Sequence, residues 1–275
     1  VKLRRSLGQS QGLRLDPFLM LDEFATDNPD DYIAGFPAHP HRGFETVTYM
    51  LEGDFLHEDH LGHKGHLRGG GAQWMTAGRG IIHSEMPQQQ SGRMHGFQLW
   101  INLPAAEKMK PAAYRDLAPD EIPDVTLVNG TRVRVVAGTF SQGDVELNGP
   151  IQGISTQPLF FDVRLPAGGS FSHGLAATHS AFVYPFEGQV RVGDKHATPL
   201  QSGDAGVLGE GEQLLLHAAE GPARFLLLAA APLNEPITQY GPFVMNTREE
   251  IEQAIADYNA GTLTGPSLGA QGARP

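Results

Sequence analysis

Short runs of alternating or β-branched hydrophobic residues recur along the whole chain and predict a protein built from β-strands. Most of these runs are bounded by Gly or Pro, which mark turns. The expected strands cover residues 46–51, 96–102, 131–136, 159–165, 181–186, 189–192 and 224–228. Many short strands joined by tight turns are typical of a sandwich or barrel, so we expect an all-β fold.

One helix is predicted near the C-terminus. Thr247 and Glu250 have the spacing of a capping box, in which the two residues satisfy each other's backbone N–H groups. The residues that follow form one apolar stripe along a helix: Ile251, Ala254, Ile255 and Tyr258. Gly261 is a suitable end for this helix. Residues 262–275 are rich in Gly, Pro, Ser and Ala, which predicts a loose tail.

An internal repeat indicates a duplicated β unit. Residues 49–53 (Tyr-Met-Leu-Glu-Gly) resemble residues 184–188 (Tyr-Pro-Phe-Glu-Gly), and each copy is followed by a Gly-rich turn and an apolar strand. We therefore expect an N-terminal barrel in residues 1–137. A second barrel, together with the helix and the tail, is expected in residues 138–275.

Composition excludes several classes of function. The formal net charge of -11 argues against binding nucleic acid through its phosphates. The absence of cysteine excludes disulfides, thiolate metal sites and cysteine nucleophiles, so a bound metal must use His, Asp or Glu. Residues 1–18 lack the apolar core of a secretory signal, and the longest apolar run, 225–233, is too short to span a bilayer. We expect a soluble protein with no membrane partner, cytoplasmic, or nuclear if the source is eukaryotic.

The main chemical signal is a concentration of histidines in the first half of the chain. Two pairs have the i, i+2 spacing that places both side chains on one face of a strand: His39 with His41, and His83 with Glu85. If these two strands face one point, they supply three imidazoles and a carboxylate. Nitrogen and oxygen ligands without sulfur suit iron, manganese, copper, nickel or zinc. Four such ligands leave open positions on an octahedral ion, an arrangement suited to non-haem iron that binds substrate and dioxygen.

A second carboxylate competes for the role of ligand. Glu45 shares strand parity with His39 and His41, and residues 35–53 fit the cupin motif loosely, in which a glutamate at this place is often a ligand. Parity alone does not choose between Glu45 and Glu85. Four further histidines lie in a polar, Gly-rich stretch that we interpret as a solvated loop: His57, His60, His63 and His66.

Other residues near the pairs have two interpretations each. Arg42 and Arg79 could favour an anionic substrate, but Arg42 alternates with His41 and would then point away from it. Three large side chains could either form the walls of an aromatic pocket or pack in the core: Phe44, Trp74 and Met75.

These motifs resemble the pirin family over nearly the whole chain. The most specific blocks are residues 39–47, 73–87 and 95–102, with further matches at 15–18, 22–24 and 240–246. The resemblance implies a bicupin: two antiparallel β-barrels of the cupin type, stacked face to face, with a short C-terminal helix. It implies one metal, usually Fe(II), in the N-terminal barrel, with Mn, Ni, Cu or Zn as alternatives. The family's ligands fall on four residues: His39, His41, His83 and Glu85. Glu45 then lines the pocket or orients an imidazole.

The second barrel lacks these ligands at the repeat positions. Gly174 and Ala176 stand where the first histidine pair stands in the first copy, and the apolar run 214–216 replaces the His83 strand. His173 is one residue out of register, so we expect it to face the opposite side. The second barrel is expected to hold no metal.

The resemblance also implies a function. Pirins are similar to quercetin 2,3-dioxygenases, so we expect a flavonol and O2 as substrates, with ring opening and release of CO. Glu85 or Glu45 would take the proton of the flavonol hydroxyl. The alternative is an iron-dependent redox-sensing protein that binds a protein partner, as a transcriptional coregulator or a modulator of a metabolic enzyme. A third hypothesis is another small-molecule enzyme on the same fold. A bicupin buries enough surface to be monomeric.

Overall fold

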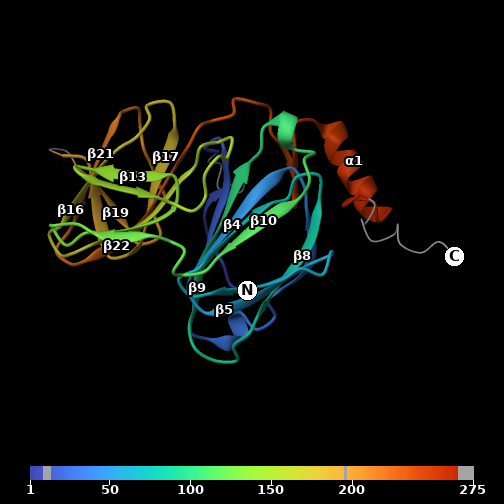
Figure 1. Cartoon of the computed structure of the whole chain (residues 1–275), viewed down its shortest axis with the longest axis horizontal. Coiled ribbons are helices and arrows are strands. Elements are labelled where there is room, and N and C mark those ends of the chain that lie inside the picture. The colour runs from blue at the N-terminus through green and yellow to red at the C-terminus, as the bar shows by residue number, and fades with distance from the viewer. Residues whose placement is uncertain (9–13, 195–196, 266–275) are drawn as a thin grey trace. The chain divides into compact units, whose positions relative to one another are not determined.

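Antiparallel strands build both units of the chain in this computed structural model, which describes residues 1–8, 14–194 and 197–265 (Figure 1). One unit comprises residues 1–5, residues 18–119 and the described chain from residue 233 onward. The other comprises residues 120–232 and the described part of residues 6–17. The boundary at 137/138 stays a prediction. The expectation of an all-β bicupin with one C-terminal helix is confirmed.

The described part of the first unit contains two larger sheets and one two-stranded sheet. The six-stranded sheet has the order β1 (Arg4–Gly8), of which only residues 4 and 5 belong to this unit, then β2 (Phe18–Thr26), β9 (Met94–Asn102), β4 (Phe44–Glu52), β7 (Ala72–Thr76) and β10 (Ala113–Leu117). The four-stranded sheet has the order β3 (Phe36–His41), β8 (Ile81–Pro87), β5 (Asp54–Asp59) and β6 (Lys64–Arg68). The unit also contains β23 (Thr238–Tyr240), β24 (Phe243–Met245), and the short 3-10 helices η2 (Pro29–Asp31) and η3 (Ala105–Glu107).

The second unit repeats this arrangement around an apolar core. Its six-stranded sheet has the order β11 (Asp124–Thr126), β12 (Arg132–Ala137), β15 (Leu159–Leu165), β22 (Ala223–Ala230), β17 (Ser180–Glu187) and β20 (Gly206–Val207). The smaller sheets are β16 (Ser170–Gly174), β21 (Gln213–Ala218), β18 (Gln189–Val192) and β19 (Thr198–Gln201), and the pair β13 (Thr139–Gln142) and β14 (Val145–Asn148). All seven strands expected from the sequence are present.

His173 corrects one expectation about the second unit. It is buried rather than turned outward, and its ring stacks on Phe140 with centroids 5.5 Å apart. Phe161 and Phe171 also contact this ring. The register that we inferred from the repeat was therefore wrong by one residue for this strand. The side chain occupies an aromatic environment in which burial lowers its pKa.

The predicted helix is α1 (Arg248–Asn259), and its capping box is confirmed. Thr247 accepts a hydrogen bond from the Glu250 backbone, and the Glu250 carboxylate accepts from the backbone of Thr247. The chain leaves the helix through Gly261, whose φ of +70° is accessible to glycine. Residues 266–275 of the predicted tail lie outside the described residues.

The stretch that we interpreted as a solvated loop contains the strands β5 and β6, so the loop assignment was wrong. Three of its histidines are exposed as we expected, namely His60, His63 and His66, whereas His57 is buried. Alternate residues of β5 are buried, namely Phe55, His57 and Asp59. Burial alternates with a period of two along β5, as expected for a strand. The hydrophobicity of the sequence does not show this alternation, because two of the three buried residues are polar.

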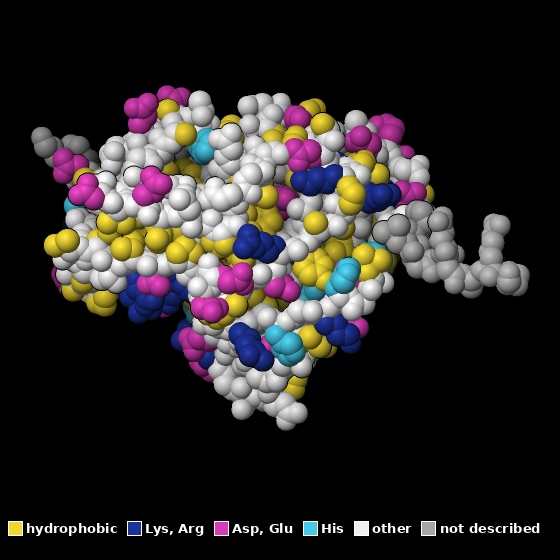
Figure 2. Space-filling view, in the orientation of Figure 1, with side chains coloured by type: hydrophobic (Ala, Val, Ile, Leu, Met, Phe, Trp, Pro, Cys, Tyr) yellow, Lys and Arg dark blue, Asp and Glu magenta, His cyan; other side chains and the backbone are white. Residues whose placement is uncertain are grey.

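Charge is distributed without a large basic patch on the face shown in Figure 2, where Lys and Arg side chains lie singly or in small groups among Asp and Glu. Within the part of the chain that the structure describes, no helix has the length and apolar character needed to cross a membrane.

Candidate metal centre

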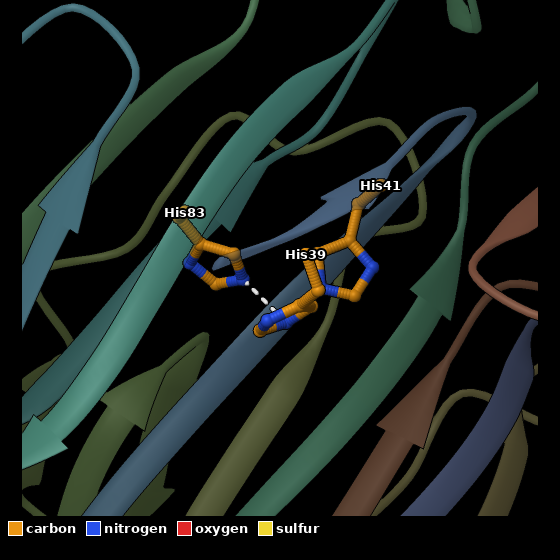
Figure 3. A group of neighbouring side chains, drawn as sticks. All are labelled: His39, His41 and His83. Carbon is orange, nitrogen blue, oxygen red and sulfur yellow. Dashed lines mark hydrogen bonds between the residues drawn. The ribbon is translucent and has the colours of Figure 1, made fainter. Parts of the chain in front are cut away.

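Three histidines from two neighbouring strands meet inside the first unit. His39 and His83 are directly opposite each other in the antiparallel ladder of β3 and β8, and His41 lies two residues along β3 on the same face. One ring nitrogen of each histidine lies within 4.8 Å of the others. The rings point toward one another, with His83 Nε2 3.0 Å from His39 Nε2 (Figure 3). The strand register thus brings together the three histidines predicted from the sequence.

The electrostatic environment favours neutral imidazoles. His41 and His83 are each 2% exposed. Burial and the neighbouring histidines hold the pKa of both rings well below the ordinary value. A neutral imidazole keeps one nitrogen lone pair, which is the form that binds a metal.

The residues fit a transition-metal ion. Both ring nitrogens of His41 are buried and have no hydrogen-bond partner among the residues that the structure describes. Such groups are rarely left unsatisfied. A cation placed among the three rings would satisfy one of the two His41 nitrogens and separate the close pair of His39 and His83 nitrogens. Imidazole donors without sulfur suit Fe, Mn, Ni, Cu or Zn.

Glu85 lies on the same face of β8 as His83 but does not belong to the cluster of ligand atoms. Its buried carboxylate accepts hydrogen bonds from Thr48 Oγ1 at 3.2 Å and from Gln98 Nε2 at 3.3 Å. Trp100 Nε1 in turn donates to Gln98 Oε1 at 3.3 Å. The six-stranded sheet therefore holds the Glu85 carboxylate through side chains from two of its strands.

Glu45 points away from the histidines, contrary to the parity expectation. The ring of the preceding residue, Phe44, lies 5.2 Å from that of His41, and adjacent strand residues face opposite sides. Glu45 instead accepts a hydrogen bond of 2.6 Å from Thr76 Oγ1, and burial raises its pKa. The parity argument fails because the chain turns at Gly43, with φ +90°, between β3 and β4. The catalytic role expected for Glu45 remains a prediction, and the orientation of its side chain argues against that role.

His57 is the functional candidate that the sequence interpretation missed. Its side chain on β5 is 1% exposed, and its Nδ1 lies 3.3 Å from Nδ1 of His83. Its ring also packs on Tyr114, with centroids 5.2 Å apart. The signal that could have found it is the alternation of Phe55, His57 and Asp59 along one strand.

An apolar pocket of about 350 Å³ lies beside the cluster. Ile81 in its wall is paired with His41 across the ladder, and Asp59 is paired with His83. The remaining lining residues are His60, Leu61, His63, Ala112, Ala113 and Tyr114. Met75 packs with Ile81 behind this wall. The volume is within the range of small-molecule sites.

The other residues singled out from the sequence take structural positions. The Phe44 and Trp100 rings pack together next to His41, with their centroids 4.4 Å apart. Trp74 is paired with Val47, on the face of the sheet opposite to Thr48. Arg42 points away from the cluster, as its alternation with His41 predicted, and contacts the C-terminal helix.

A duplicated cupin architecture with a histidine cluster inside one unit defines a bicupin with a candidate metal centre. The family model described as Pirin matches residues 1–101, and the Pirin C-terminal cupin domain matches residues 160–264. The chain belongs to the pirin family.

Named relatives agree with this assignment. A Pseudomonas aeruginosa protein named "Putative quercetin 2,3-dioxygenase" is 52% identical over 263 residues, covering 96% of this chain and 92% of that protein. Human Pirin is 42% identical, covering 94% and 86%. A crystal structure of quercetin 2,3-dioxygenase from Acinetobacter baumannii is 35% identical with a TM-score of 0.86, covering 97% and 92%.

Proposed function

We propose that this protein is a metal-dependent dioxygenase that opens a flavonol such as quercetin. One O2 is consumed, the central ring opens to a depside, and one CO is released. The observation that carries the proposal is the cluster of three histidines beside an apolar pocket, in which both ring nitrogens of His41 are buried without a hydrogen-bond partner among the residues that the structure describes. The names of two similar proteins, from Pseudomonas and Acinetobacter, support the substrate class.

The metal would be held by His39, His41 and His83, with Glu85 as a fourth ligand or as a base beside it. We propose Fe(II), with Mn, Ni, Cu or Zn as alternatives that suit the same donors. When bound, such an ion supplies Lewis acidity, which lowers the pKa of a coordinated hydroxyl.

Residues of the chain would bind the substrate and move its proton. The pocket walls formed by Ile81 and Tyr114 offer flat apolar surface to an aromatic ring and exclude water from it. The Glu85 carboxylate is the buried base nearest along the strand to His83, and it would accept the flavonol proton. Thr48 and Gln98 hold that carboxylate in place through the hydrogen bonds described above.

The test is depletion of quercetin, measured together with O2 uptake and CO release, on iron(II)-loaded protein. His41→Ala removes a ligand from the cluster, and His217→Ala on β21 is the matched control outside it. We expect repeated turnover in the wild type and in His217→Ala, and none in His41→Ala. An iron-loaded wild type that leaves quercetin intact would overturn the enzymatic proposal. Binding of a protein partner that differs between the ferrous and ferric states would then support the regulatory alternative.

A further inference from the structure

Arg42, the residue that follows the candidate ligand His41, is held by the C-terminal helix. Its side chain is 3% exposed. Nη1 donates to Asp257 Oδ2 at 2.7 Å, Nη2 donates to the backbone oxygen of Leu263 at 3.0 Å, and Nε donates to the backbone oxygen of Arg79. All three nitrogens of the guanidinium group therefore donate to protein oxygens. Two of these oxygens belong to residues in α1 or shortly after it, namely Asp257 and Leu263.

The backbone of Arg42 is held by the same part of the chain. Its N–H donates to the oxygen of Pro242 at 3.2 Å, and its own oxygen accepts from Val244 N at 3.0 Å. The result is a parallel bridge between the end of β3 and β24. The fit is close, because a Cβ added to Gly43 would lie 2.0 Å from the Val244 oxygen.

The second ligand strand rests on the same support. Ile82, which precedes His83 on β8, packs against one hydrophobic cluster on and around α1. In Figure 1, α1 lies on the same side of the first unit as β8. The buried members of the cluster are Phe243, Met245, Ile251, Ala254 and Leu263. Ile82 and Arg42 both alternate with candidate ligands, so their side chains lie on the face of the strands opposite to the metal centre.

We propose that residues 242–263 form the support that positions the metal ligands, and that Arg42 and Asp257 are its positioning pair. A metal site requires its imidazoles to be held to within a fraction of an ångström, and residues behind the ligands set that geometry. The two ligand strands contact this support at the residues adjacent to His41 and His83. This inference rests on the proposed metal centre and does not depend on which reaction occurs there.

Asp257→Ala tests the pair directly, with Glu252→Ala as its matched control. Both acidic residues are on α1 and both bind an arginine, but Glu252 pairs with Arg248 in the solvent, at 59% and 83% exposure. Metal-free protein would be titrated with cobalt(II), and binding followed by its visible absorption. We expect Asp257→Ala to raise the Kd about tenfold, as is typical of residues behind a ligand. Glu252→Ala should leave the Kd unchanged. Arg42→Lys keeps the charge but loses the fork of donors, so it should also weaken binding.

A second measurement distinguishes positioning from general stability. If α1 and the metal centre are coupled, the coupling is reciprocal, so cobalt(II) must stabilise the helix. Amide hydrogen exchange in residues 251–257 should slow when cobalt(II) binds to the wild type, and this slowing should be lost in Arg42→Lys. Equal exchange rates in the wild type with and without cobalt(II) would overturn the inference. This measurement does not need Asp257→Ala, so it decides the matter even if that variant does not fold. A folded Asp257→Ala with wild-type affinity would also overturn the inference. A wild type that binds no cobalt(II) would overturn the metal centre together with its support.

Discussion

His57 should set the proton position of the ligand His83. In the structure Nε2 of His83 lies 3.0 Å from Nε2 of His39, so a hydrogen bond between them requires a proton on one of these nitrogens. A metal requires both to be free. The other nitrogen of His83, Nδ1, lies 3.3 Å from Nδ1 of His57, which can accept its proton. His57 thereby stabilises the tautomer of His83 in which Nε2 offers a lone pair.

The magnitude follows from the burial of both rings. His57 and His83 are 1% and 2% exposed, so no bulk water replaces a lost partner. A buried donor without a partner costs about 1–3 kcal/mol. Because about 1.4 kcal/mol corresponds to a factor of ten, removing the acceptor should weaken metal binding about 10- to 100-fold.

Two substitutions separate the hydrogen bond from packing. His57→Phe keeps an aromatic ring against Tyr114 and removes both nitrogens. His57→Asn places an acceptor oxygen near the position of Nδ1. Competition with a chelator for cobalt(II) gives both affinities, and thermal unfolding of the metal-free proteins checks their folding. We expect strong weakening in His57→Phe and partial recovery in His57→Asn. Wild-type affinity in His57→Phe, or equal weakening in both variants, would show that the reasoning is incorrect.

Three further predictions concern catalysis and stability. Glu85→Gln should lower quercetin turnover about 10²–10⁴-fold, whereas Glu45→Gln should retain wild-type turnover. Steady-state kinetics of both variants measures this difference. Equal losses in the two variants would indicate that Glu45 also acts as a base. Burial lowers the pKa of Lys108 from 10.5 to about 8. Between pH 8 and pH 10.5 the unfolded chain therefore binds more protons at Lys108 than the folded protein does. The free energy of unfolding should rise by about 3 kcal/mol as the pH increases across this range. Denaturant unfolding at both pH values should show this rise, and Lys108→Met should abolish it. Gly43→Ala should cost about 1–3 kcal/mol in thermal unfolding, because it combines φ +90° with a clash against Val244.

Local patterns were sufficient to predict the strands and the helix. β-branched and aromatic residues located the strand around residues 46–51, alternation located the strand around 96–102, and the capping box located the start of α1. The i, i+2 spacing within β3 and within β8 also placed each candidate ligand pair on one face. These inferences succeed because each depends on the geometry of a single element.

Relations between elements were not predictable in this way. The contact of His57 with His83 spans 26 residues, and that of Arg42 with Asp257 spans 215. Neither leaves a local pattern in the sequence. Parity also misled us for Glu45, because a turn resets which face a residue occupies. The pairing of strands, rather than their location, decided which polar residues meet.

The chain returns to its first unit after completing the second, and this unit has a polar interior. His41, His57, His83 and Glu85 are buried at positions where apolar side chains would have stabilised the fold. Contacts from residues 242–263 act on the outer side of the same strands. There the Lys108 ammonium binds the oxygens of Gly43 and Val244 at 2.8 and 3.0 Å, and Asn102 Oδ1 at 2.6 Å. In the second unit His173 lies among phenylalanines, and the same kind of sheet encloses an apolar cluster. The support is therefore attached to the unit whose interior contains the candidate metal ligands, where geometry must be held against the cost of buried polar groups.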